Sequence, residues 1–150
     1  MTIWSGPQPA PKAMWQVIHS NFPIVRNLGI YNKRVVAGTH TLSHHSEGRA
    51  LDIGLSALRP DEKELGDALF DLFIESTREL RLDEVIWNRR IWSAARPHVH
   101  AHTGQNPHTD HIHIGYTRPG SQATTVPSIV RMRIAALRTG LEDLRRQAIA

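Results

Sequence analysis

The sequence predicts an α+β fold, with a small central antiparallel sheet, flanking helices and an amphipathic helix at the C-terminus. Short stretches with strand alternation are mixed with helical stretches in no regular βαβ repeat, which argues against a doubly wound parallel sheet. The length of 150 residues suits one domain with a hydrophobic core, and 40% hydrophobic with 21% charged residues is typical of a globular protein.

The first third of the chain begins with a proline-rich extended segment that leads into a helix over residues 12–20. Met14, Trp15 and Ile18 recur there at helical spacing. Pro11 suits the first turn of such a helix, where its missing N–H costs nothing. Apolar pairs then predict short strands at residues 24–25, 29–31 and 35–37.

A polar segment over residues 40–49 leads into a strand at residues 50–53. Alternation along this strand places Ala50 and Asp52 on one face and the two aliphatic residues between and after them on the other. The strand therefore presents a carboxylate on the face opposite its apolar side chains.

The clearest helix begins at Pro60, has acidic residues in its first turn and runs to about Leu80. A hairpin follows, in which residues 84–87 pair with residues 91–92 across a short turn. Residues 96–109 are expected to form a loop rich in histidine, glycine and proline. Strand alternation then returns at residues 111–114.

The last predicted helix begins at Val126 and carries apolar residues at intervals of three and four, close to heptad register. We expect residues 1–120 to form the main domain. The helix within residues 121–150 is expected to pack on that domain or on its copy in a homodimer, and contact with a membrane or wall surface is the lesser alternative. The apolar stripe comprises Val126, Val130, Ile134, Leu137, Leu141, Leu144 and Ala148.

Histidine is abundant, with ten residues in the chain, whereas cysteine is absent. The absence of cysteine excludes disulfides, thiolate zinc sites and cysteine nucleophiles, so any metal site must use histidine and carboxylate. All histidines except His19 fall within residues 40–45 and 98–113. Two separate clusters of this kind are expected of a metal site, whose ligands converge from different segments. His19, on the first helix, is assigned a structural role.

The first cluster contains the pattern Ser-x-His-x-x-Gly-x-Ala-x-Asp, formed by Ser43, His45, Gly48, Ala50 and Asp52. His45 offers a neutral imidazole and Asp52 a hard oxygen, a combination that suits zinc. Gly48 permits a sharp turn between them, and Ala50 is small enough to leave room for a metal. Ser43 is expected to hydrogen-bond a ligand.

The second cluster ends in a strand on which His111 and His113 point to the same side. Asp110 and His108 lie at the entrance of this strand. The two clusters thus supply complementary halves of one site.

Together, His45, Asp52 and His113 form a three-ligand zinc site with an open position for water. This arrangement is typical of catalytic zinc, whereas structural zinc sites are usually closed. Asp110 and His111 remain available to take a proton from that water or to stabilise an oxyanion.

These residues resemble the D-alanyl-D-alanine metallopeptidases, which share a superfamily with lysostaphin-type peptidases and the hedgehog signalling domain. The resemblance covers about residues 29–116 and implies a fold of that type, zinc as the cofactor, and cleavage of peptide bonds next to D-amino acids in peptidoglycan. It implies that His45, Asp52 and His113 bind the zinc. It also implies that Arg34 binds the substrate, by a bidentate contact to its carboxylate. The matching motifs are Tyr31-Asn-x-Arg34, Ala37-Gly-Thr39, Ser43-x-His45-x-x-Gly48-x-Ala50-x-Asp52-Ile53 and Asp110-His-x-His113.

The catalytic base is the point at which the chain departs from many members of this family. They carry glutamate three residues before the last histidine ligand, where this chain has Asp110. The spacing of His108, His111 and His113 instead resembles the penicillin-insensitive murein endopeptidases and lysostaphin. The base is therefore either Asp110 or His111, and we favour His111 with Asp110 assisting and His108 as a substrate contact. Glu84 is a third candidate that we rank low, because its segment indicates a strand.

The remaining histidines are assigned no firm role. His98, His100 and His102 would share one face of an extended segment, where they either line the cleft or bind a second, weak metal. A solvated loop is an equally good interpretation. His40 and His44 are expected to flank the site without touching the metal.

The function that these features favour is a zinc-dependent peptidoglycan hydrolase, either a D-alanine carboxypeptidase or a cross-link endopeptidase. A catalytically silent zinc-binding cell-wall module is the alternative, and a metal-dependent nuclease is less favoured. Against the nuclease, the sequence shows no phosphate-cradling glycine loop and no basic stripe interleaved with aromatics. We therefore expect peptidoglycan peptides as the partner and no nucleic acid.

The net charge is +4, which is ordinary for a small domain in water. The first residues contain neither the basic nor the apolar region of a secretory signal, and no apolar run is long enough to span a membrane. We therefore expect synthesis in the cytoplasm without stable membrane insertion. Action at the wall or periplasm would follow release of a phage endolysin, secretion of a toxin, or export as part of a larger protein.

Overall fold

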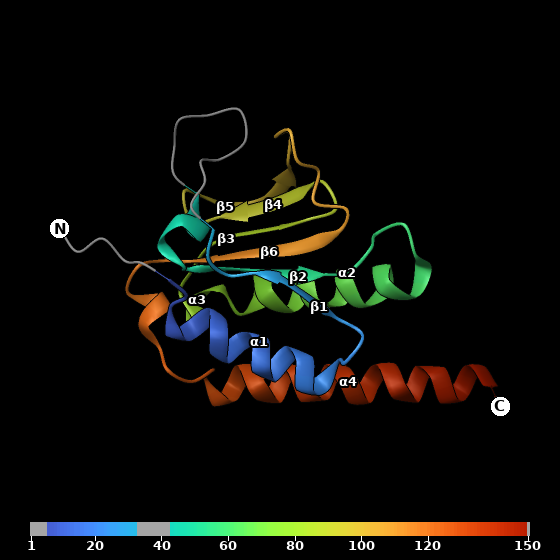
Figure 1. Ribbon diagram of the computed structural model, residues 1–150. Helices are drawn as coiled ribbons and strands as arrows, with labels where there is room; N and C mark the ends of the chain where they lie inside the picture. Colours follow the sequence, from blue (N-terminus) through green and yellow to red (C-terminus); the bar gives the residue numbers. More distant parts are fainter. Residues whose placement is uncertain (1–5, 33–42, 150) are drawn as a thin grey trace.

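The computed structural model describes residues 6–32 and 43–149, and within them the strands form one six-stranded antiparallel sheet (Figure 1). The order across the sheet is β1-β2-β6-β3-β4-β5. The mixture of sheet and helices confirms the predicted α+β class. The strands are β1 (Arg26–Gly29), β2 (Ala50–Gly54), β3 (Leu82–Trp87), β4 (Arg90–Ser93), β5 (Arg96–Ala101) and β6 (His111–Tyr116).

The α-helices all lie on one side of this sheet (Figure 1). Two of them pack directly on it, α1 against β2 and α2 against β3, and α4 packs on α1 and α2 from beyond. One sheet face is therefore sealed by helices, and the opposite face is free to carry polar groups. The helices are α1 (Pro9–Asn21), α2 (Pro60–Glu75), α3 (Thr77–Leu80) and α4 (Ser128–Ile149), with 3₁₀ turns η1 (His44–Glu47) and η2 (Gly120–Gln122).

The two central strands show why the faces differ. Leu51 and Ile53 of β2, together with Ile112 and Ile114 of β6, are completely buried in the core beneath the sheet. Strand alternation turns the residues between them towards the other face. The alternation expected for the strand at 50–53 is thus present, and it leaves the polar residues of both strands on the face away from the helices.

Three predicted elements differ in their bounds. The strands expected at 24–25 and 29–31 are one strand, β1, which pairs with β2 over residues 26–29. The strand expected at 35–37 lies outside the described residues. The long helix expected to reach Leu80 is interrupted at Ser76, whose φ of −104° and ψ of 11° depart from helical geometry, so that α2 ends at Glu75 and α3 continues from Thr77 to Leu80.

The segment expected to be a loop at residues 96–109 begins with a strand instead. Asn88 and Arg89 adopt left-handed φ values of 46° and 64°, the geometry of a tight two-residue hairpin turn. The hairpin prediction is therefore confirmed, and its second strand β4 in turn pairs with β5, His100 lying opposite Ile91. The loop prediction was wrong for residues 96–101. An exposed strand at the edge of a sheet does not need the apolar alternation by which strands are predicted from sequence.

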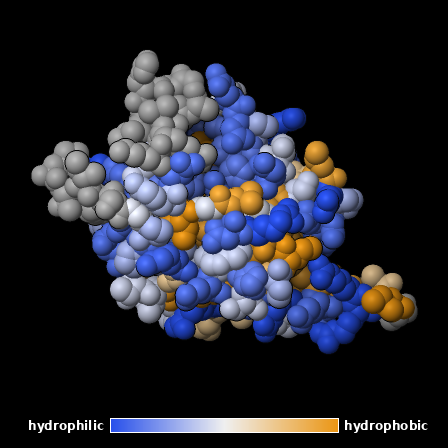
Figure 2. All heavy atoms as spheres, in the orientation of Figure 1, coloured by the Kyte–Doolittle hydropathy of each residue, from blue (hydrophilic) through white to orange (hydrophobic). Residues whose placement is uncertain are grey.

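The C-terminal helix packs on the domain from its start to Leu141. Val130 and Ile134 are fully buried, whereas every described residue after Leu141 is exposed. Figure 1 shows the second half of α4 running past α1, and Figure 2 shows apolar atoms at its far end on a largely hydrophilic surface. Within the described ranges, no helix has both the length and the apolarity that crossing a membrane requires.

Candidate metal centre

The candidate site lies on the free face of the sheet, where β2, β6 and η1 meet. Asp52 of β2 is the cross-strand partner of His113 on β6, and Gly54 is that of His111. Directly paired residues share a face, so sheet register alone brings Asp52 and both histidines together. The last component, His45, comes from η1, which contacts both β2 and β6.

The turn that carries His45 is closed by Gly48, whose φ of 67° is left-handed. A Cβ at this position would lie 1.9 Å from the carbonyl oxygen of Gly6, so only glycine fits. The Gly48 carbonyl also accepts the backbone N–H of Gln8 at 2.9 Å. The segment before α1 therefore holds η1 in place.

Three of the residues proposed as metal ligands converge on one point. Nε2 of His45 and Nδ1 of His113 each lie 3.0 Å from the same oxygen, Oδ1 of Asp52. The three residues are 2%, 6% and 5% exposed, respectively. The structure thus assembles in its interior the ligand set expected from the sequence.

The protonation pattern of this set fits a cation. Nδ1 of His45 lies 2.9 Å from the carbonyl oxygen of Ile30, which can only accept, so Nδ1 carries the hydrogen. With a cation bound, His45 would be neutral and the lone pair of its Nε2 would face the ion beside Asp52. Without one, a hydrogen on Nε2 would bridge His45 and Asp52. The buried carboxylate needs a donor or a positive charge beside it in either case. These residues could hold a metal ion.

The charges of the site are strongly coupled. Burial alone would raise the pKa of Asp52, but hydrogen bonds from His113 and His45 outweigh it and hold that pKa far below its usual range. Burial would lower the pKa of His113, yet its bonds to Asp52 and Glu84 raise it to about 10. Because metal ligands must be deprotonated, occupation of the site would release a proton.

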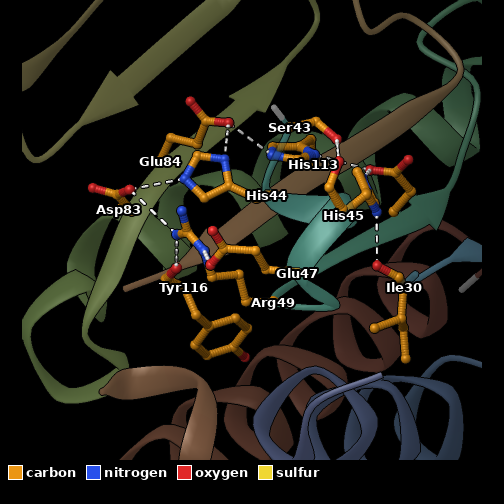
Figure 3. A network of polar contacts seen from close by, with 12 residues as sticks. Ile30, Ser43, His44, His45, Glu47, Arg49, Asp83, Glu84, His113 and Tyr116 are labelled. Atoms are coloured by element: carbon orange, nitrogen blue, oxygen red, sulfur yellow. Dashed lines mark hydrogen bonds and ion pairs between the residues drawn. The ribbon is translucent and has the colours of Figure 1, made fainter. Parts of the chain in front are cut away.

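A second layer of polar groups lies behind His113 (Figure 3). Oε1 of Glu84 lies 2.9 Å from Nε2 of His113 and 2.9 Å from Nδ1 of His44. Nε2 of His44 lies 2.8 Å from Oδ2 of Asp83. Acids and imidazoles therefore alternate from Asp83 to Asp52.

The sequence pattern alone does not predict that Glu84 and His44 join the site. Glu84 lies on a strand, as expected, but the strand is in register with β6, so that Glu84 pairs with Gly115 and faces the site. His44 packs over the same glycine, where an added Cβ would lie 3.0 Å from its ring. His44, Glu84 and His113 form a second group that could hold a metal ion. The available signal was the alternation of Glu84 with buried Val85.

The two candidate bases form a pair at the rim of the site. Nδ1 of His111 lies 2.6 Å from Oδ1 of Asp110, and Nε2 of His111 lies 3.6 Å from Oδ1 of Asp52. The Asp110 side chain is 77% exposed, whereas His111 is buried. The geometry places His111 towards the site and Asp110 behind it.

His108 lies next to this pair, with its ring centroid 4.6 Å from that of His111. Its Nδ1 lies 2.9 Å from the carbonyl oxygen of Asn106, which fixes the hydrogen on that nitrogen. Burial and the neighbouring His113 and His111 lower the pKa of His108 to about 4. The ring is therefore neutral at physiological pH.

The remaining proposed residues are less central. Ser43 is buried, and its hydroxyl lies 3.4 Å from that of Ser46 in the same turn. Arg34, like His40, lies outside the described residues. His98 and His100 lie on β5 with ring centroids 5.3 Å apart, at the far edge of the sheet.

The family model described as "VldE, C-terminal domain" matches residues 4–113. The matched stretch ends at His113 and so includes all three of the converging residues, His45, Asp52 and His113. No curated protein and no solved structure matches the chain.

Proposed function

The chain belongs to the VldE C-terminal domain family, and within that family we propose that it is a zinc-dependent hydrolase of peptidoglycan. The bond cleaved is a peptide bond at a D-amino acid of the stem peptide. The observation that carries the proposal is the buried convergence of His45 and His113 on one oxygen of Asp52. The substrate class comes from the resemblance to D-alanyl-D-alanine metallopeptidases.

Zinc is the metal that suits this donor set best. Two neutral imidazole nitrogens and one carboxylate oxygen are the ligands of many catalytic zinc sites, and thiolates are absent from the chain. A zinc ion held by His45, Asp52 and His113 supplies a Lewis acid that polarises a carbonyl and lets water lose a proton near neutral pH.

In this proposal His111 is the general base. Asp110 accepts the N–H of its Nδ1, which leaves the lone pair on Nε2, the nitrogen nearer to Asp52. Nε2 takes a proton from the attacking water as the water oxygen bonds to the scissile carbonyl carbon. The same proton then passes to the leaving amine as the C–N bond breaks. Asp110 stabilises the imidazolium in between.

His108 completes the proposed site on the substrate side. It adjoins His111 and stays neutral, so it can bond the amide of a peptide without attracting a proton from the base. A neutral imidazole beside a base keeps the proton on the group that must deliver it. We propose that the enzyme meets this substrate at the cell wall, delivered as an endolysin or as a secreted toxin.

Digestion of purified sacculi tests the proposal. The zinc-loaded protein is incubated with sacculi and, separately, with plasmid DNA, each with and without chelator, and Asp52→Asn is the matched inactive variant. We expect chelator-sensitive release of muropeptides that the variant does not produce. Mass spectrometry distinguishes loss of a terminal D-alanine from conversion of dimers to monomers.

Other outcomes of the same experiment would reject the proposal. Sedimentation of the protein with sacculi without any released product would indicate a silent zinc-binding wall module. Chelator-sensitive nicking of DNA with intact sacculi would indicate a nuclease.

A further inference from the structure

We propose that Glu84 is the positioning residue of the metal centre. Its carboxylate accepts the Nε2–H of His113 and thereby fixes the tautomer and ring orientation that present Nδ1 to the ion. The inference rests on the proposed metal site at His45, Asp52 and His113, and it adds a role for the β3 strand that the ligand set does not include.

The hydrogen count supports this role. Oε1 of Glu84 lies 2.9 Å from Nε2 of His113, and an ionised carboxylate can only accept. Nε2 must therefore carry a hydrogen, and the proton that leaves His113 when an ion binds is the one on Nδ1. This is the nitrogen that lies 3.0 Å from Oδ1 of Asp52. Carboxylates in such a position commonly set the tautomer of a metal-bound histidine.

Glu84 is itself held on both sides. Nδ1 of His44 bonds the same oxygen at 2.9 Å, and Nε2 of His44 bonds Asp83 at 2.8 Å. Nη1 of Arg49 lies 3.5 Å from that aspartate. Glu84 also sits in the middle of a paired strand, and a group on a strand is placed more exactly than one on a loop. The carboxylate is thus fixed before any ion arrives.

The alternative is that Glu84 is a ligand in the second group, with His44 and His113. Burial argues against it, because the side chains of Glu84 and His44 are 24% and 16% exposed, whereas those of His45 and Asp52 are 3% and 8%. A neutral His113 also has one lone pair, so it serves one group at a time. We assign the ion to the buried group and the orienting role to Glu84.

Zinc affinity and histidine tautomers test the assignment. The zinc dissociation constant of the full chain is measured by competition with a chromophoric chelator, and long-range ¹H–¹⁵N spectra report which nitrogen of His113 carries the hydrogen. We expect Glu84→Ala to weaken zinc binding about 10–100-fold. Glu84→Gln should restore most of the affinity, because its amide oxygen also accepts the Nε2–H.

The matched control is Glu62→Gln, which changes another buried glutamate, on α2 beneath the sheet. We expect it to leave the zinc affinity and the His113 tautomer unchanged. An unchanged zinc affinity in folded Glu84→Ala, or an Nδ1–H tautomer in zinc-loaded wild type, would overturn the positioning role. Two ions per wild-type chain and one in Glu84→Ala would make Glu84 a ligand. If Glu84→Ala does not fold, Glu84→Leu, which keeps the side-chain volume but cannot accept the Nε2–H, takes its place with the same expected loss of zinc affinity.

Failure of this inference can be told from failure of the proposed function. If Asp52→Asn binds zinc as tightly as the wild type, the metal site itself is wrong. If Asp52→Asn loses zinc and Glu84→Ala does not, only the role of Glu84 is wrong. Neither readout depends on cleavage of peptidoglycan.

Discussion

His113 and His100 lie on the same face of one sheet and in one cross-strand row, but their surroundings differ. The row runs from His113 through Ile86 and Ile91 to His100. His113 is buried between two carboxylates, whereas His100 bonds the backbone carbonyl of its neighbour His98 on an exposed strand. Among the described residues, only His113 of this row belongs to a group that could hold a metal.

The comparison shows what places a histidine in a group that could hold a metal ion. The close spacing of histidines along a strand is not enough, because β5 carries alternating histidines as closely spaced as those of β6. The difference is an opposing carboxylate on a neighbouring strand, together with burial that makes an unpaired lone pair costly. The predictions below test that difference, from the largest effect to the smallest.

Removal of a ligand should have the largest effect. In His45→Ala we expect zinc binding to weaken by more than the loss of about 10–100-fold expected of Glu84→Ala, and peptidoglycan cleavage to be abolished, because Asp52 and His113 are left as an incomplete buried set. Isothermal titration with zinc and digestion of sacculi measure the two losses. His100→Ala is the matched control on the exposed strand and should match the wild type. Cleavage retained in His45→Ala would contradict the site assignment.

Removal of the proposed base should separate catalysis from binding within the buried region. We expect His111→Ala to lower kcat about 10²–10⁴-fold, the usual contribution of a general base, while zinc binds within tenfold of the wild-type affinity. Steady-state kinetics on purified muropeptides and zinc titration check this. A loss of zinc as large as that in His45→Ala would show that His111 is a fourth ligand instead.

The ion pair of Glu62, on the helix side of the sheet, tests whether a buried and paired carboxylate also stabilises the fold there. Glu62 is buried, and Nη1 of Arg26 lies 2.7 Å from its carboxylate. This hydrogen bond lowers the pKa of Glu62. Because the folded-state pKa is below the unfolded one, the stabilisation is present above about pH 4.3 and is lost as the pH falls through the folded value.

We therefore expect Glu62→Gln to reduce the free energy of unfolding by about 1–3 kcal/mol at pH 7, without changing zinc affinity. Urea unfolding at pH 7 and at lower pH measures the effect, and the difference from the wild type should shrink as the pH falls. A difference that stays constant with pH would show that the charge of Glu62 contributes nothing.

The double change His98→Ala and His100→Ala should have the smallest effect. Zinc affinity at the buried site and cleavage should be unchanged, because His98 is exposed, His100 is half-buried, and both bond within their own segment. Retention on an immobilised nickel column should decrease, since exposed imidazoles bind such metals weakly. A fall in cleavage would extend the functional site across the sheet to β5.

The same difference explains which parts could be predicted from sequence. The pairing of Asp52 with His113 follows from local alternation on two strands, each with an unmistakable apolar side. The place of Glu84 depends on the register between β3 and β6, which is set by contacts between residues far apart in the chain. Strand β5 could not be predicted from the sequence, because its residues are mostly exposed and it has no buried apolar face of the kind that marks a half-buried strand.

The attachment of η1 to the segment before α1 has a practical consequence for engineering the chain. The Gly48 turn touches Gly6 and accepts a hydrogen bond from Gln8, so the loop that carries His45 is fastened to residues near one terminus. The other terminus lies at the exposed end of α4, away from the sheet (Figure 1). An affinity tag, fluorophore or surface tether is therefore best fused after α4, where it leaves the candidate metal centre undisturbed.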